Sequence, residues 1–203
     1  MKQFNGYSEA KEAAQYTPGM KLPAGGYVCK IMAVRYTNGQ NGNSDMITLQ
    51  FDIVEGEHKD FFKKQYEANT QEDKKWKGTA RIYCPKDDGT EQDRWTKNNF
   101  ARWTNAFEES NPGYAWDWDE NKWKDKLIGI VFGETGTVIE GKEIVYTEAR
   151  SADSVQNIRD GKFYEQKFKA KNGWTGTQQK NSNSDNSTGF MNITEGIEEE
   201  IPF

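Results

Sequence analysis

Basic and aromatic residues are interspersed along residues 59–86. This stretch holds eight lysines and arginines against four acids, with five aromatic rings among them. Cations neutralise the phosphates of a nucleic-acid strand, and flat rings stack with its bases at about 1–3 kcal/mol per base. The stretch therefore predicts a nucleic-acid interface; the alternative is a solvated strand and loop whose rings point inward. The predicted contacts are Lys63, Lys64, Tyr66, Lys74, Lys75, Trp76, Lys77, Arg81 and Tyr83.

The motif "KKWKG", residues 74–78, gives the most specific prediction within this stretch. A tryptophan flanked by three lysines in a loop that ends in glycine has little reason to be buried, so we expect Trp76 to be exposed. Lys30, Arg35 and Tyr36 lie in a β-like segment beside the Asn/Gly-rich loop 38–44 and would continue the interface. Burial of Tyr36 by a neighbouring strand is an equal alternative.

A second candidate site is the terminal motif "EEEIPF", residues 198–203. Its isoleucine and phenylalanine would each gain about 1.5–3 kcal/mol from burial, yet they follow a long polar stretch. We therefore expect them to fill an apolar pocket on another protein while the acids meet a basic rim. The predicted partner-binding residues are Glu198, Glu199, Glu200, Ile201, Pro202 and Phe203.

Charge and composition divide the chain into three parts. Residues 181–203 contain five acids and no lysine or arginine, so they carry the whole formal net charge of −5 and leave the rest neutral. From residue 168 onward the sequence is rich in Asn, Ser, Gly, Gln and Thr, a composition that does not offset the entropy of ordering. We predict a folded domain over 1–167, a flexible linker over 168–197 and an interaction tip over 198–203.

Other chemistries lack their required residues. His58 is the single histidine, and Cys29 and Cys84 show no metal-ligand spacing. The segment 136–143 has phosphate-loop spacing but carries Glu143 where Ser or Thr is needed. We therefore expect no metal, no cofactor and no enzyme. The chain shows no signal peptide and no apolar run of about 18 residues, which favours a cytoplasmic protein without membrane contact.

The elements that must position these residues follow from periodicity. Alternation predicts strands over 26–37, 46–54 and 60–68, with a short strand or strand end at 80–85 and a hairpin over 126–135 and 142–150 joined by a loop. Between them, residues 90–109 read as one helix. Its aromatic stripe predicts core packing for Trp95, Phe100, Trp103 and Phe107. For "YAWDWDENKW", residues 114–123, acids alternate with rings, so we expect a strand or a cover on the body.

The predicted fold class is mainly β. Three strands, a helix and two strands is the order of an OB-fold, a five-stranded partly open barrel that binds oligonucleotides or sugars. The single helix then lies between strands 3 and 4, and a disordered C-terminal tail follows the barrel. An α+β domain of another topology is the alternative.

The motif "EEEIPF" resembles the tip of bacterial and phage single-stranded-DNA-binding proteins, the SSB family. The polar linker and the strand order resemble that family in kind, and "FNGYSEAKEA", "PAGGYVCKI" and "TLQFDIVEGEHKD" look like a phage-encoded variant. The insertion "NTQEDKKWKG" and the long Trp-rich helix depart from the family pattern. The resemblance implies binding of single-stranded DNA without sequence specificity in phage DNA replication, recombination and repair. It also implies a tip that recruits replication and recombination proteins, a host-cell cytoplasmic location and a homo-oligomer.

Two other functions fit the same sequence. The body is alternatively a protein-interaction adaptor of a phage recombination cassette that meets DNA only through partners. It is alternatively a strand-annealing or nuclease-associated factor.

Overall fold

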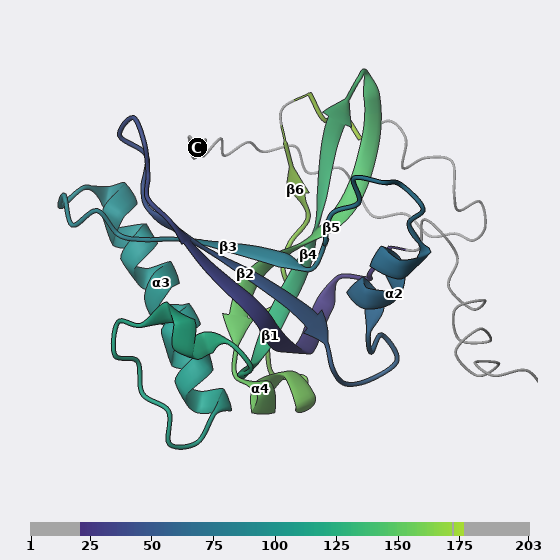
Figure 1. The fold of residues 1–203 in the computed structure, drawn as a ribbon. Helices are drawn as coiled ribbons and strands as arrows, with labels where there is room; N and C mark the ends of the chain where they lie inside the picture. Colours follow the sequence, from purple (N-terminus) through teal and green to yellow (C-terminus); the bar gives the residue numbers. More distant parts are fainter. Residues whose placement is uncertain (1–20, 172, 177–203) are drawn as a thin grey trace, which may run out of the picture.

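The computed structural model describes residues 21–171 and 173–176. Its centre is one mainly antiparallel sheet in the order β3-β2-β1-β4-β5 (Figure 1). A short strand, β6, pairs in parallel with β4. Because β3 also contacts β5, the two ends of this path approach each other. The strands are β1 (Gly25–Thr37), β2 (Met46–Ile53), β3 (Thr79–Tyr83), β4 (Leu127–Ile139), β5 (Lys142–Asp153) and β6 (Lys169–Ala170).

The predicted mainly β class is confirmed, and so are the positions of β1, β2, β4 and β5 to within a few residues. The predicted loop between β4 and β5 is too long. β4 continues to Ile139, and only Glu140 and Gly141 form the turn, both with positive φ (51° and 74°). This conformation at both central residues suits a two-residue hairpin because it matches the twist of the flanking strands.

The predicted third strand over 60–68 is wrong, because most of that segment is the helix α2 (Phe61–Ala68). Its amide groups are capped by a residue of β2: the carboxylate of Asp52 accepts hydrogen bonds from the backbone N–H of Phe62 and of Lys63, both at 3.0 Å. Phe61 and Phe62 are buried against the core. Asp52 and the core that buries the two rings lie outside α2 in the sequence. The local pattern of residues therefore wrongly predicted a strand instead of a helix.

The long helix is confirmed as α3 (Glu91–Ser110), with Thr90 as its N-cap. The hydroxyl oxygen of Thr90 accepts a hydrogen bond from the N–H of Asp93 at 3.1 Å. Phe100, Trp103 and Phe107 are buried as predicted, whereas Trp95 is 62% exposed, contrary to the core assignment. Asp93 of α3 is also buried, so the buried face begins before Trp95. Trp95, two residues after Asp93, lies about 200° around the helix from it and faces the solvent.

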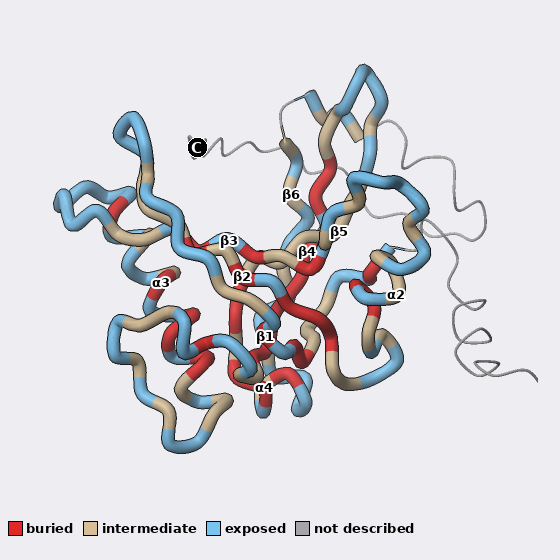
Figure 2. Tube along the Cα trace, in the orientation of Figure 1, coloured by how far each residue is buried: buried red, intermediate tan, exposed pale blue. Residues whose placement is uncertain are grey.

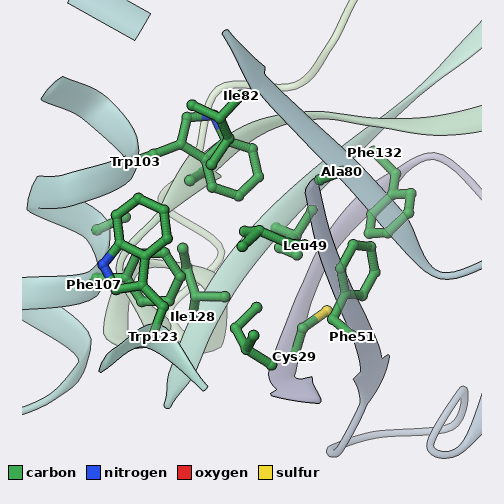
Figure 3. Close-up of a cluster of buried hydrophobic side chains, with 14 of the residues drawn as sticks. Cys29, Leu49, Phe51, Ala80, Ile82, Trp103, Phe107, Trp123, Ile128 and Phe132 are labelled. Atoms are coloured by element: carbon green, nitrogen blue, oxygen red, sulfur yellow. The ribbon is translucent and has the colours of Figure 1, made fainter. Parts of the chain in front are cut away.

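The core lies between α3 and the inner faces of the strands (Figure 3). Trp123, from the 3-10 helix η1 (Glu120–Trp123), stacks on Phe107 with ring centroids 4.5 Å apart. The expected cover over 114–123 is therefore confirmed, as loop and 3-10 helix rather than strand. On the outer side of β1 and β4, the helix α4 (Val155–Arg159) buries a smaller apolar cluster.

Residues 168–171 and 173–176 belong to the folded part, although the predicted linker begins at residue 168. Lys169 and Ala170 pair with β4, and the rings of Phe168 and Trp174 lie 5.6 Å apart, both close to Gly136. Glu143 accepts hydrogen bonds from the N–H and the hydroxyl of Thr175, at 2.7 and 2.5 Å. The boundary of the domain thus falls later than predicted. The remainder of the predicted linker and the tip lie outside the described residues.

Candidate nucleic-acid interface

Strand register brings two predicted cations to the same face of the sheet. Arg35 on β1 pairs with Thr48 on β2, and Thr48 pairs with Arg81 on β3. Residues that face each other across neighbouring strands have side chains on the same side, so these three form one row across the sheet. Both arginines are exposed, and Thr48 is half-buried. The row therefore places the Cα atoms of the two arginines about 10 Å apart, with both side chains on one accessible surface.

A second row runs parallel to the first. Thr37, Met46 and Tyr83 pair across the same three strands, two residues along from the arginine row. Side chains two residues apart on a strand share a face, so Tyr83, which is 52% exposed, lies on the arginine side. We call these six residues the outer face. In Figure 1 the β1–β2 loop and the β4–β5 hairpin rise on either side of β3, and Figure 2 shows both tips as exposed.

The opposite face of these strands is the core. Val34, Leu49 and Ala80 alternate with the outer-face residues, and Leu49 is fully buried. The alternation explains why the outer face can be polar without disturbing the core. It also identifies Thr37, Met46 and Thr48 as outer-face residues that sequence reasoning left out, although the polar face of the predicted second strand already contained Thr48.

Tyr36 is not part of the outer face. It pairs with Ile47, which is buried, and lies at the end of the strand with 43% of its surface exposed. Its hydroxyl donates to the carboxylate of Asp45, which also accepts from the N–H of Gly39 at 2.8 Å. The hydrogen bond to Asp45 raises the pKa of Tyr36 to about 12. Tyr36 therefore closes the base of loop 38–44.

Lys30 is also separate from the arginine row. Its ammonium group lies 3.0 Å from the carboxylate of Asp125, and a β-bulge between Ile31 and Ala33 separates it from the Arg35 segment. Both side chains of this ion pair are substantially exposed, so the pair adds little stability.

The predicted residues of α2 and its following loop form a second group. The ammonium group of Lys74 lies 4.6 Å from the centroid of the Tyr66 ring, and that ring lies 5.8 Å from the Trp76 ring. Lys63, Lys75 and Lys77 are exposed, and Lys64 is half-buried. The group adjoins the strands because Gly78, just after it, accepts a hydrogen bond from the N–H of Phe51 at 2.9 Å.

The predicted exposure of Trp76 is wrong. The ring is half-buried against the core, and its indole N–H donates to the carbonyl oxygens of Phe51, at 3.0 Å, and of Gly78, at 3.2 Å. An indole N–H whose partners are main-chain carbonyls of β2 and the loop holds the loop to the sheet. Of the three lysines around it, Lys75 and Lys77 are exposed and Lys74 is half-buried.

The cysteines, histidine and acidic side chains of the described residues bear on other kinds of site. The described residues contain no group of three or more histidine, cysteine or acidic side chains arranged for a metal ion. Cys29 and Cys84 are free thiols, and burial raises the pKa of both. In the same residues, no helix combines the length and the apolar character that a bilayer crossing needs.

Comparison with known proteins adds no family assignment: no protein-family model matches the chain, and no curated protein matches its sequence.

Proposed function

We propose that the protein binds single-stranded DNA without sequence specificity, with the outer face of β1, β2 and β3 as the binding surface. The observation that carries this proposal is the register of Arg35, Thr48 and Arg81. Two exposed guanidinium groups on a sheet can neutralise neighbouring phosphates, and Tyr83 in the adjacent row offers a ring face to a base. The exposed Lys75 and Lys77, just before β3, extend this cationic surface along the strand.

We further propose that the domain is an OB-fold. The sheet order β3-β2-β1-β4-β5, the helix α3 between β3 and β4, and the contact of β3 with β5 support it. OB-folds bind oligonucleotides on strands 2 and 3 and with the loops that join strands 1 to 2 and 4 to 5. The outer face and its two flanking hairpins occupy those positions.

Recruitment of replication and recombination proteins through residues 198–203 is the second half of the proposal. Its support is the residue pattern alone: three acids and two large apolar side chains. A partner pocket with a basic rim suits both features.

The decisive experiment titrates labelled oligo-dT and a duplex of equal length with the full chain at two salt concentrations. Binding is expected to favour oligo-dT, and log affinity should fall with log salt by about 0.7 per neutralised phosphate. Replacing both arginines (Arg35→Ala with Arg81→Ala) should lower that slope by about 1.4 and weaken binding at low salt by at least about tenfold.

Arg94→Ala is the matched control, since Arg94 is an exposed arginine on α3 that pairs with Glu91 at 3.3 Å. It should leave both the slope and the affinity unchanged. Equal binding of duplex, or an unaltered slope in the double arginine variant, contradicts the proposed interface. If oligo-dT also leaves the intrinsic tryptophan fluorescence unchanged, an adaptor function is favoured instead.

A further inference from the structure

Trp118 is the most exposed large apolar side chain of the described residues, with 80% of its surface accessible. It lies in the loop between α3 and η1, and η1 contacts β1, one of the strands of the outer face. Single exposed apolar residues are common, but a ring as large as tryptophan adds considerable apolar surface where water must solvate it. Its surroundings therefore decide whether the exposure is incidental.

Trp118 lies beside a chain of neighbouring aromatic rings that leads to the core. One face of its ring stacks on Phe100, with centroids 6.4 Å apart and planes 13° apart, and Trp116 lies 5.9 Å away at 57°. Trp116 in turn lies 4.7 Å from the buried Trp123. The Trp118 ring thus lies beside aromatic side chains that connect to the core, while most of its surface is exposed to solvent.

The backbone at Trp118 is strained. Its φ is +68°, in the left-handed region that bulky side chains rarely adopt and that costs them about 1–2 kcal/mol. The loop is fastened on both sides: Asp117 pairs with Lys122, and the N–H of Trp116 donates to Glu108 at 2.7 Å. The fold therefore holds an exposed ring in an unfavourable conformation, which is typical of positions with a binding role.

The charge around the ring selects the kind of partner. Residues 108–120 contain five acids and no lysine or arginine, and Lys122, just after them, pairs with Asp117 and lies 4.0 Å from the carboxylate of Asp119. Asp119 keeps 45% of its side chain exposed, and Glu120 follows it. These carboxylates repel a phosphate backbone, whereas a cation over the face of a tryptophan ring is attracted by the ring itself.

We propose that Trp118, with Asp119 and Glu120, forms a docking platform for a basic segment of a partner protein. An arginine of that segment stacks on the free face of Trp118, and its neighbouring cations pair with the two carboxylates. The platform lies in the α3–η1 segment, whereas the outer face lies on β1, β2 and β3, and η1 contacts β1. Its existence does not depend on the DNA-binding proposal.

The test uses a labelled peptide of alternating glycine and arginine, with the same peptide carrying citrulline in place of arginine as the uncharged control. Trp118→Ala in the full chain should weaken arginine-peptide binding by about five- to thirtyfold. Trp118→Gly should do the same while folding at least as stably, because glycine accepts the positive φ. Asp119→Asn with Glu120→Gln should weaken binding at low salt and retain the cap of η1, whose N–H of Asn121 bonds to Asp119.

Trp95→Ala is the matched control, an exposed tryptophan on α3 without a ring partner among the described residues. It should leave peptide affinity unchanged, and all variants keep the same acidic C-terminal residues, so differences among them report the platform. Equal loss in Trp95→Ala, equal binding of the citrulline peptide, or unchanged binding in Trp118→Ala overturns the proposal. Loss of oligo-dT affinity in Trp118→Ala also overturns it, since the ring then serves nucleic-acid bases.

Discussion

At the scale of single residues, the indole of Trp76 joins two segments that are distant in sequence. Its N–H donates to Phe51 on β2, 25 positions earlier, and to Gly78 in its own loop. Its ring also lies beside that of Tyr66 on α2. Trp76 therefore anchors the lysine-bearing loop to β2, and Lys75 and Lys77 are exposed to solvent.

The anchoring role predicts the effect of Trp76→Phe. Phenylalanine keeps a flat apolar ring but loses the N–H donor, so the free energy of unfolding should fall by about 1–2 kcal/mol. Urea unfolding with an unchanged m-value measures this loss. Trp95→Phe, at an exposed position, should change stability by less than about 0.5 kcal/mol. Equal stabilities for wild type and Trp76→Phe would show that the indole bonds do not hold the loop.

The sequence was sufficient to place Arg35 and Thr48 on a polar face, but it was not sufficient to predict the burial of Trp76. Alternation within residues 26–37 and 46–54 separates core from solvent side chains, so Arg35 and Thr48 could be assigned to a polar face from sequence. Pairing Arg81 with them required the register between β2 and β3. The burial of Trp76 depends on a carbonyl of β2 and on the neighbouring helix α2. The local sequence "KKWKG" does not indicate either contact.

At the scale of elements, the clearest contrast is between α3 and α2. α3 carries its own signals: Thr90 as N-cap, acids in the first turn and apolar residues at helical spacing over 20 residues. α2 spans 8 residues and has no side-chain cap from its own N-cap residue. Asp52 supplies the cap from β2, although burial raises its pKa and its three backbone donors oppose that effect. A short helix that is stabilised by tertiary contacts is hard to predict from its local sequence.

The junction of β4, β5 and β6 makes a prediction at this scale. Glu148 on β5 accepts a hydrogen bond from the Thr135 hydroxyl at 2.7 Å and lies 3.5 Å from the ammonium group of Lys171, just after β6. Burial raises the pKa of Glu148, but Thr135, Lys171 and Arg150 outweigh that effect and lower it overall. A carboxyl with a lowered folded-state pKa stabilises the fold above its unfolded pKa of about 4.3 and loses this contribution as pH falls through the folded value.

Glu148→Gln should therefore lower the urea midpoint at about pH 7, and the difference from wild type should shrink below about pH 4. Glu134→Gln, at an exposed carboxyl on β4, is the control and should leave the midpoint unchanged at both pH values. A difference between wild type and Glu148→Gln that persists at low pH would assign the effect to packing rather than charge.

At the scale of the whole molecule, the negative charge and the cationic surface are separated along the chain. The described domain ends in a segment that packs on β4 and β5 up to Gly176, and the five acids that make up the net charge come after it. Composition placed the end of the folded domain at residue 167, whereas Thr175 and Gly176 still hydrogen-bond to Glu143 on β5. The fold continues because Lys169 and Ala170 pair in parallel with β4 and the ring of Trp174 lies close to Gly136. This segment has no run of alternating residues that could have predicted a strand.

The separation predicts distinct effects for two changes at residues 198–203. Removing all six should leave affinity for oligo-dT equal or raise it by up to about threefold at low salt, because three acids of the same chain no longer compete with phosphates for the cations. The same removal should abolish capture of replication and recombination proteins from host extract by the immobilised chain. Phe203→Ala retains the acids, so it should leave oligo-dT affinity unchanged and still lose that capture. A large loss of oligo-dT affinity in either variant would contradict the proposed division between a folded DNA-binding surface and a separate partner-binding tip.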